Sequence, residues 1–217
     1  MTASSAPAGL LALRAIVRDD AATAFLWMAY TVAIDAVDGT LARAVRVKEA
    51  IPWVDGSRLD DVVDYFTYVL VPAFFLLHMN LLPAACAVPI VALVAIASAY
   101  GFSQTAAKTS DHFFTGFPSY WNIVAFYLYA LGWSLPVNAA WVVALAIGVF
   151  VPLRYVYPSR TPTLRWLTVG LGCVWGVMVI YILTHLHSAP HGLVVTSLAF
   201  PVYYFLLSLY LHARPRA

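Results

Sequence analysis

Long apolar runs interrupted by short polar segments set the pattern of this chain. A membrane-spanning helix needs about 20 predominantly apolar residues, and runs of about that size recur from one end of the chain to the other. We interpret eight of them as transmembrane helices, the first one short: 1–17, 21–34, 59–78, 82–100, 120–135, 139–153, 164–184 and 194–211. Pro72 lies inside the third run and is expected to kink that helix.

Composition supports the same class. The chain is 63% hydrophobic and 10% charged, and its mean hydropathy is +0.83, values typical of an integral membrane protein. The formal net charge of +2 is small, and no basic tract alternates with aromatic residues, so no nucleic-acid partner is expected. Without internal repeats or low-complexity linkers, residues 1–217 are expected to form a single domain. The predicted fold is an all-α polytopic membrane bundle.

Basic residues predict how this bundle is oriented. Lys and Arg follow the second, fourth and sixth runs and the last one, whereas the loops after the third, fifth and seventh runs contain neither. Because cytoplasmic loops are enriched in Lys and Arg, both termini are expected in the cytoplasm. Only Arg18 breaks the alternation. A six-helix arrangement would require two of the apolar runs not to span the membrane.

Residues 35–64 hold most of the chain's acidic side chains. Of ten carboxylates in the sequence, seven lie here: Asp35, Asp38, Glu49, Asp55, Asp60, Asp61 and Asp64. A carboxylate near a bilayer is costly unless it is paired, hydrated or bound to a metal. Asp35 and Asp38 are three residues apart and Asp60 and Asp64 four, so each pair shares a helix face. Two such pairs on neighbouring helices can converge on hard divalent cations. A hydrated cytoplasmic loop is the alternative.

Small residues and one arginine continue these acidic faces. Gly39 and Ala42 follow Asp35 on its face, and Gly56 precedes Asp60 by one turn. Small residues let a ligand approach the backbone closely, and the guanidinium of Arg43 suits phosphate. Together these features indicate a phosphoryl-transfer site. A Walker-type glycine loop, a Gly-x-Ser-x-Gly elbow and a His-Glu-x2-His pair are absent from the sequence, which argues against the commoner NTPase, hydrolase and zincin classes.

The motif DAVDGTLAR, at residues 35–43, followed by GSRLDDVVD, at residues 56–64, resembles the signature of the CDP-alcohol phosphotransferases. The spacer between the two parts, residues 44–55, is longer than in most members of that family. The sequence RVKEAIPWVDG, at residues 46–56, is similar to that of the bacterial phosphatidylcholine synthase branch. The same is true of KTSDHFF at residues 108–114 and GFPSYWN at residues 116–122. The resemblance covers most of the chain. Compared with the family, the chain is expected to begin partway through the first helix.

The resemblance implies a reaction and roles for these residues. CDP-diacylglycerol and choline would be joined with release of CMP, in the inner membrane of a bacterium and on its cytoplasmic side. Two divalent ions, Mn²⁺ or Mg²⁺, are expected. The implied metal ligands are Asp35, Asp38, Asp60 and Asp64, of which Asp64 would also be the base that takes the proton of the alcohol. The implied CDP-binding residues are Gly39, Ala42, Arg43 and Gly56.

Two alternatives stay open. Within the same enzyme class the acceptor could be serine or glycerol phosphate, although an anionic acceptor would need spare cations near the site. From another class, the chain could be a divalent-cation transporter. A transport path needs polar residues at the bilayer midplane, whereas these acidic residues lie at one predicted membrane face.

Choline carries a quaternary ammonium, which aromatic faces hold by cation–π attraction. Several aromatic residues fall near the predicted cytoplasmic ends of helices, where an ordinary interfacial belt would also place them. The candidates for choline binding are Tyr65, Tyr100, Tyr120 and Trp121. Separately, Gly172-x3-Gly176 is a small-residue pattern that suits packing within the chain, with a homodimer as the other use.

Overall fold

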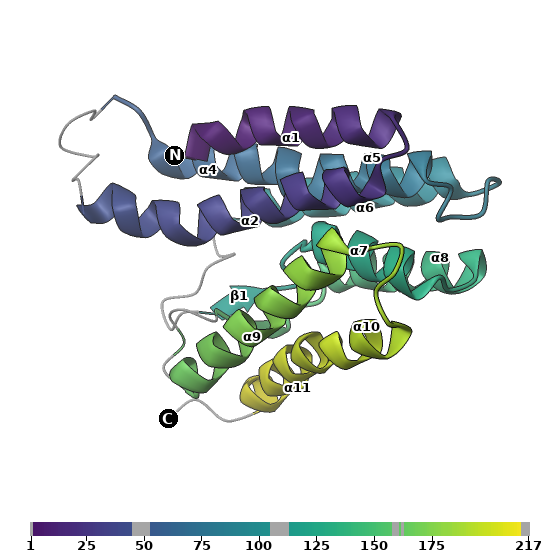
Figure 1. Cartoon of the computed structure of the whole chain (residues 1–217). Helices are drawn as coiled ribbons and strands as arrows, with labels where there is room; N and C mark the ends of the chain where they lie inside the picture. The colour runs from purple at the N-terminus through teal and green to yellow at the C-terminus, as the bar shows by residue number, and fades with distance from the viewer. Residues whose placement is uncertain (1, 45–52, 105–112, 158–160, 162, 214–217) are drawn as a thin grey trace.

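In the computed structural model, the described residues are 2–44, 53–104, 113–157, 161 and 163–213, with side chains undescribed for 2, 3, 38–44 and 114. This part of the chain is mostly helical (Figure 1). The helices before the middle of the chain are α1 (Thr2–Val17), α2 (Ala21–Ala44), α4 (Gly56–Asp64), the π-helix η1 (Tyr65–Leu70), α5 (Val71–His78) and α6 (Ala87–Ser103). The later ones are α7 (Trp121–Leu131), α8 (Leu135–Gly148), α9 (Arg165–Thr184), α10 (His191–Ser197) and α11 (Ala199–Ala213).

Within the described part of the chain, three continuous helical segments are long and apolar enough to cross a membrane: Gly56–His78, Arg165–Thr184 and His191–Ala213. The first joins α4, η1 and α5, and the last joins α10 and α11. Shorter apolar helices occupy Ser4–Val17, Ala21–Val37, Ala87–Ser103, Trp121–Leu131 and Leu135–Gly148. Each of the eight predicted apolar runs therefore contains a helix, which confirms the predicted helical fold and is consistent with a membrane protein.

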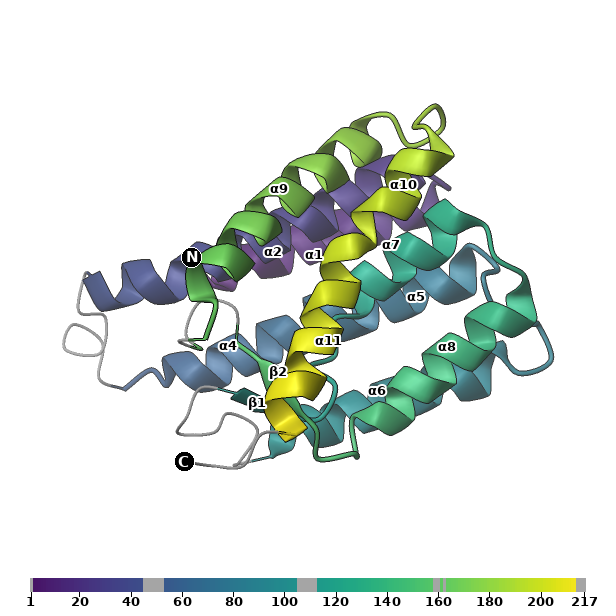
Figure 2. The same ribbon diagram turned by 90° about the horizontal axis from the view of Figure 1, so that it is seen from below.

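Successive helices run back and forth between two ends of the bundle. In Figure 1, α1 and α2 lie beside the helix formed by α4 and α5, while α9, α10 and α11 lie below them at an angle. The view from below in Figure 2 shows α10 and α11 running past α7 toward β1 and β2. The start of α1, the start of α4 and the end of α11 lie toward the same end of the bundle. We call this the acidic end, because the carboxylates described below lie there.

Aromatic side chains in the bundle interior hold α2 against its neighbours. The ring centroid of Phe25 on α2 lies 4.4 Å from that of Phe75 on α5 and 5.7 Å from that of Phe126 on α7. All three rings are buried. Aromatic pairs at such separations contribute about 0.5–1.5 kcal/mol beyond the area that they bury. This contact fixes the position of α2 relative to α5, and so places Asp35 relative to α4.

A π-helical turn directly precedes Pro72. The backbone N–H of Val71 donates to the carbonyl of Phe66, five residues back, so η1 has one extra residue in its turn. Pro72 follows at the start of α5, where its missing N–H is tolerated. Sequence analysis predicted a kink at this proline. The structure shows instead that the irregularity lies before it, between Asp64 and Val71.

A short two-stranded sheet at the acidic end was not predicted. β1 (Phe113–Thr115) pairs antiparallel with β2 (Arg154–Val156), and Phe113 is opposite Val156. Both of these residues are buried against Leu207 and Leu211 of α11. The sheet therefore joins the loop before α7 and the loop after α8 to the last helix.

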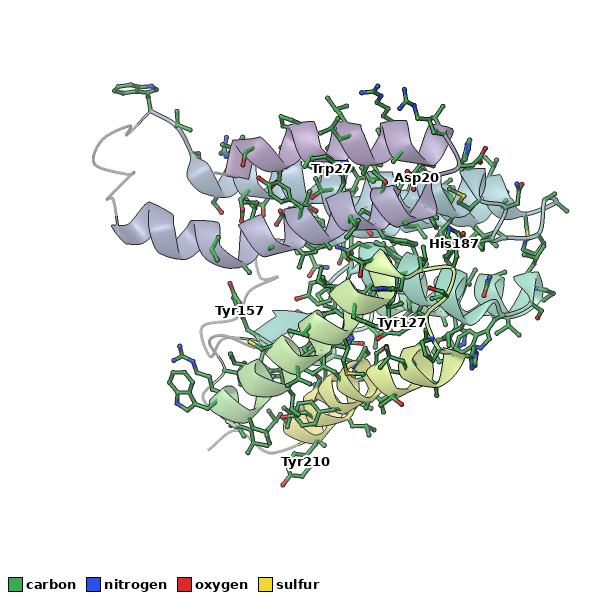
Figure 3. All side chains as sticks on the ribbon, viewed as in Figure 1. Asp20, Trp27, Tyr127, Tyr157, His187 and Tyr210 are labelled. Atoms are coloured by element: carbon green, nitrogen blue, oxygen red, sulfur yellow. The ribbon has the colours of Figure 1, made fainter. Side chains whose placement is uncertain are left out.

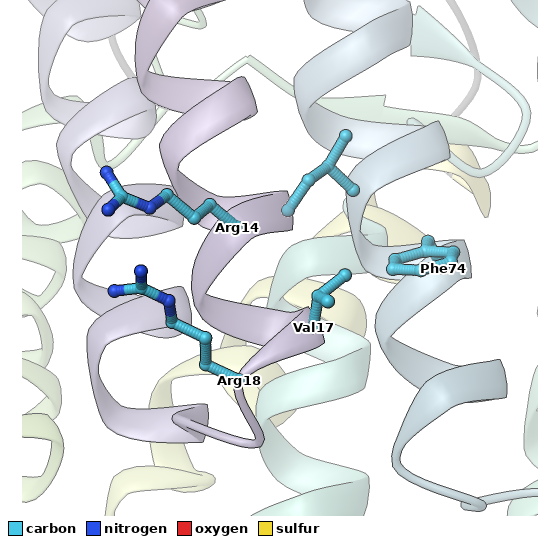
Figure 4. Close-up of a pocket in the computed structure, with 5 residues that line it drawn as sticks. Arg14, Val17, Arg18 and Phe74 are labelled. Atoms are coloured by element: carbon cyan, nitrogen blue, oxygen red, sulfur yellow. The ribbon is translucent and has the colours of Figure 1, made fainter.

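The opposite end of the bundle carries a shallow pocket. Its volume is about 440 Å³, and it is lined by residues of α1, the following turn and α5 (Figure 4): Leu13, Arg14, Val17, Arg18 and Phe74. Asp20 and His187 also lie toward this end, at the right of Figure 3. The pocket and the carboxylates of residues 35–64 therefore lie at different ends of the molecule.

Candidate active site

Three carboxylates from two helices converge at the acidic end. Asp35 projects from α2, while Asp60 and Asp64 project from α4. Each offers an oxygen atom, and these oxygen atoms lie within 4.8 Å of one another. All three side chains are half-buried. We call this group the acidic trio. Its two residues on α4 are four positions apart and share a face, as their spacing predicts.

Asp55 fixes the start of the helix that carries two of these acids. It is the N-cap of α4, and its side chain accepts hydrogen bonds from the backbone N–H groups of Ser57, at 3.0 Å, and Arg58, at 3.3 Å. An N-cap of this type stabilises a helix by about 1 kcal/mol. Arg58 also forms an exposed ion pair with Asp55. Asp55 therefore has a structural role, distinct from that of the acidic trio.

Tyr68 joins α4 and α2 at the acidic trio. Its hydroxyl group donates a hydrogen bond to Oδ2 of Asp35 at 3.0 Å. The side chain belongs to η1, four residues after Asp64, and is buried. Tyr68 is not among the site residues predicted from the sequence. The spacing of positions 60, 64 and 68 is only a weak signal for this residue, because each four-residue step of an α-helix moves about 40° round the helix axis.

The remaining residues of the motif lie around this site. Asp38, Gly39, Ala42 and Arg43 belong to α2, beyond Asp35, but their side chains lie outside the described part of the structure. Residues 45–52, which include Glu49, are also outside it. Gly56 is the first residue of α4, and a Cβ added to it would meet no atom of the described residues within 4 Å. Among the described residues, no contact therefore requires a glycine at position 56.

One of the four choline candidates lies beside the acidic trio. The ring of Tyr120 is centred 6.3 Å from the ring of Tyr68, whose hydroxyl binds Asp35. On its other side lies Tyr204 of α11, with ring centroids 6.4 Å apart. Tyr204 in turn stacks on Tyr155 of β2 at 6.3 Å. A row of tyrosine rings thus leads from Asp35 to α11, and burial raises the pKa of the Tyr155 phenol, which stays neutral.

Buried hydrogen bonds hold Tyr120 at this position. The indole N–H of Trp121 donates to the Ser98 hydroxyl at 2.8 Å, and the hydroxyl of Ser119 donates to the same oxygen at 3.0 Å. Both neighbours of Tyr120 are therefore fixed to α6. Trp121 is fully buried, which gives this choline candidate a packing role.

The other two candidates make contacts elsewhere. The hydroxyl of Tyr65 donates to the carbonyl of Ala95 on α6 at 3.0 Å. The ring of Tyr100 packs on Phe150, with centroids 5.0 Å apart, and half of the residue is exposed. Of the four candidates, the structure places Tyr120 next to the ring that binds Asp35.

The acidic trio fits a hard divalent cation. Three carboxylates this close repel one another when all are ionised, and a cation between them removes that cost. Mg²⁺ and Mn²⁺ prefer oxygen ligands, and Mg²⁺ is usually bound in proteins by one or two carboxylates together with substrate phosphates. The donor set is entirely oxygen. An ion there could neutralise the charge of a bound pyrophosphate.

Comparison with known proteins finds relatives named phosphatidylcholine synthase. No family model matches the chain. The phosphatidylcholine synthase of Legionella pneumophila is 47% identical over 193 residues, which cover 88% of this chain and 72% of that protein. The phosphatidylcholine synthase of Legionella bozemanae is 52% identical over 137 residues, or 62% of this chain and 63% of that protein.

A third relative extends the likeness to a different genus. The phosphatidylcholine synthase of Bradyrhizobium diazoefficiens is 39% identical over 182 residues, which cover 84% of this chain and 68% of that protein. Identity at this level over most of both chains, together with an acidic trio formed by the sequence motif, establishes kinship: the chain belongs to the phosphatidylcholine synthase family.

Proposed function

We propose that this chain transfers the phosphatidyl group of CDP-diacylglycerol to choline and releases CMP. The choline hydroxyl oxygen forms a bond to the phosphorus that carries the diacylglycerol. The bond from that phosphorus to the oxygen bridging it to CMP breaks, and CMP leaves with the electron pair. The proton of the choline hydroxyl goes to a carboxylate of the enzyme. The observation that carries this proposal is the acidic trio in a chain related to phosphatidylcholine synthases.

The carboxylates divide this work between them. Asp35, Asp38 and Asp60 would hold Mn²⁺ or Mg²⁺, with two ions expected. When bound, the ions neutralise the pyrophosphate and align it for in-line displacement. Asp64 would accept the proton from choline, and one of its oxygens can also contact an ion. A carboxylate that lies among others suits this role, because neighbouring negative charge favours taking up a proton.

Other residues of the motif would bind the nucleotide. Arg43, one turn beyond Gly39 on α2, would face the phosphates, and Gly39, Ala42 and Gly56 would leave room for CDP. The open space beside Gly56 supports this assignment. Tyr120 is the aromatic residue that we propose for the ammonium group, because its ring lies next to Tyr68 at the acidic trio.

The reaction is tested with purified chain, CDP-diacylglycerol, choline and Mn²⁺. We expect CMP and phosphatidylcholine to form together. Serine, glycerol phosphate and inositol, supplied singly in place of choline, distinguish the acceptor. CMP release with serine and none with choline would overturn the choice of acceptor, and release with no acceptor would overturn the reaction class.

We also propose one membrane domain with eight spans and both termini in the cytoplasm, in the inner membrane of a bacterium. The support is that the start of α1, the end of α11 and the acidic trio share one end of the bundle (Figure 1). Arg58, Arg154 and Arg165 belong to segments at that end. Cysteines placed singly at residues 53 and 133, in a chain whose native Cys86 and Cys173 are changed to Ser, test this arrangement. A membrane-impermeant thiol reagent added to intact cells should label only residue 133.

The first glycine of the Gly172-x3-Gly176 pattern packs within the chain. A Cβ added to Gly172 would lie 3.3 Å from the ring of Phe200. A Cβ at Gly176 would meet no atom of the described residues within 4 Å. That surface of α9 is available for the proposed homodimer. Crosslinking through a cysteine at residue 176, in a chain whose exposed Cys173 is changed to Ser, tests it.

A further inference from the structure

Tyr68 is a buried phenol placed at a carboxylate rather than at a backbone carbonyl. Two other hydroxyl groups of the same helical segment bond to carbonyls: that of Tyr65 to Ala95, and that of Thr67 to Val63. A carbonyl is enough to satisfy a buried hydroxyl. The hydroxyl of Tyr68 instead donates at 3.0 Å to Asp35, a member of the acidic trio, and hydrogen bonds to ionised acceptors are the stronger kind.

The π-helical turn keeps Tyr68 on the face of the two acids of α4. In an α-helix each residue turns about 100°, so four residues overshoot a full turn by about 40°. Asp64 therefore lies about 40° round the helix axis from Asp60. Four more α-helical residues would place position 68 a further 40° or so round in the same direction. η1 has five-residue hydrogen-bonded turns, as from Val71 to Phe66. Each residue there turns less, which returns Tyr68 toward the acidic trio.

The hydrogen bond leaves Asp35 able to bind a cation. A carboxylate has two oxygens with about four acceptor positions. The Tyr68 hydroxyl occupies one position on Oδ2. This bond therefore uses one of about four acceptor positions of the carboxylate. The bond fixes the rotation of the carboxylate, so its remaining lone pairs point in defined directions.

We propose that Tyr68 is a positioning residue for the metal site, which it serves by orienting Asp35 from η1. This inference rests on the proposed function, since it takes the acidic trio as the metal site of the transferase. Hydrogen bonds from the outer shell to a metal ligand typically contribute 10- to 100-fold to metal affinity. Tyr68 would therefore set how tightly the divalent ion binds, with little direct part in the chemical step.

The test measures Mn²⁺ binding to the purified full-length chain by the loss of the free-ion EPR signal, in the absence of substrate. We expect Tyr68→Phe to raise the dissociation constant about 10- to 100-fold. In activity assays the Mn²⁺ concentration for half-maximal rate should rise by the same factor, while the rate at saturating Mn²⁺ stays within about threefold. Unchanged Mn²⁺ affinity in Tyr68→Phe would overturn the proposal.

Tyr127→Phe is the matched control. Tyr127 is also a buried tyrosine, and its hydroxyl bonds to the Ser197 hydroxyl at 2.9 Å within the helical bundle (Figure 3). This variant loses a buried phenolic hydroxyl without touching the acidic trio. Its Mn²⁺ affinity should equal that of the original chain, even where its melting temperature falls. An equal loss of affinity in both variants would mean that Tyr68 acts only through general stability.

A double variant separates positioning from packing. In chains that carry Asp35→Asn, the further change Tyr68→Phe should leave the residual Mn²⁺ affinity unchanged, because the ligand that Tyr68 orients is already altered. A further 10-fold loss in that background would overturn the proposal. Absence of Mn²⁺ binding by the original chain would overturn it together with the metal site. Mn²⁺ binding without CMP release would overturn the proposed function and leave the role of Tyr68 standing.

Discussion

Gly116 lies against the backbone of Val149, so that a Cβ at position 116 would collide with the Val149 carbonyl oxygen. The φ angle of Gly116 is +82°, a conformation that costs other residues about 1–2 kcal/mol. Its N–H donates to the carbonyl of Leu153 at 2.9 Å. This contact ties the loop before Tyr120 to the end of α8. We expect Gly116→Ala to lose about 2–5 kcal/mol of stability, from backbone strain and overpacking together.

Gly132 provides the control for the backbone term. It also has a positive φ, +61°, but a Cβ added there would meet no atom within 4 Å. Gly132→Ala should therefore lose only the strain term, about 1–2 kcal/mol. Chemical denaturation of both variants in detergent measures the difference. Equal losses would contradict the steric role of Val149.

Neighbouring acids on α4 should differ sharply in their importance. Asp60 belongs to the acidic trio, whereas Asp61 is not part of the group of oxygens that lie within 4.8 Å. Consecutive residues of a helix point about 100° apart. We expect Asp60→Asn to lower kcat/KM at least about 100-fold, by analogy with the loss of weaker outer-shell partners. Asp61→Asn should keep measurable activity.

Asp38→Asn, which alters a residue of the same motif, should behave like Asp60→Asn. CMP release at saturating Mn²⁺ is the assay, and far-UV circular dichroism confirms folding. If Asp61→Asn were as inactive as Asp60→Asn while both remained folded, the assignment of ligands by spacing would be wrong.

The sequence predicted which acids would meet, because helical spacing alone places Asp60 beside Asp64, and the motif points Asp35 toward them. It also predicted the helical runs, since apolar length is set by the membrane. Tyr120 was named among four aromatic residues, but nothing in the chain order distinguished it from Tyr100. The distinction depends on packing with Tyr68 and Tyr204, which lie far from it in sequence.

Two features could not be derived from periodicity. The position of Tyr68 depends on a π-helical turn, and an α-helical projection carries that residue away from Asp60. The β1–β2 pairing joins residues about 40 positions apart, and each strand has only three residues. Such short strands lack the alternation that identifies a strand in sequence. Their stability comes from burial against Leu207 and Leu211.

Removal of the Tyr120 ring should weaken choline binding selectively. A cation–π contact is worth about 0.5–2 kcal/mol, so Tyr120→Leu should raise the choline KM roughly 2- to 30-fold. The KM for CDP-diacylglycerol should stay unchanged. Tyr100→Leu is the control, because that ring packs on Phe150. Steady-state kinetics at saturating Mn²⁺ measure both constants, and a parallel rise of the two KM values in Tyr120→Leu would refute a specific ammonium contact.

Asp20 should make stability depend on pH at the opposite end of the bundle. The backbone N–H of Thr23 donates to its carboxylate at 3.0 Å, and this bond lowers the Asp20 pKa below its ordinary value. A lowered pKa adds stability above the unfolded-state value of about 4, and that stability is lost as the pH falls through the folded-state value. Asn caps helices equally well without titrating.

We therefore expect Asp20→Asn to melt near the same temperature as the original chain at pH 7. Below about pH 4, the original chain should lose more stability than the variant. Thermal melts in detergent from pH 7 to pH 3 compare the two. A constant difference across that range would show that the Asp20 carboxylate does not contribute through its charge.

Substitution of Gly56 can test nucleotide binding separately from protein stability. It lies at the start of α4, and an added Cβ there would meet no atom within 4 Å in the part of the chain that the structure describes. A larger side chain should therefore leave stability unchanged or raise it by up to about 1 kcal/mol, since glycine is a poor helix former. If the open space receives CDP, the same side chain should obstruct the nucleotide.

We expect Gly56→Leu to raise the KM for CDP-diacylglycerol about 10- to 100-fold, because small displacements of a reacting group are costly. The melting temperature should not fall. Gly170→Leu is the control: Gly170 is exposed on α9, and an added Cβ there also meets no atom within 4 Å. That variant should keep both kinetic constants. An unchanged KM in Gly56→Leu would mean that the glycine of the motif serves neither the fold nor the nucleotide, and would remove Gly56 from the proposed CDP site.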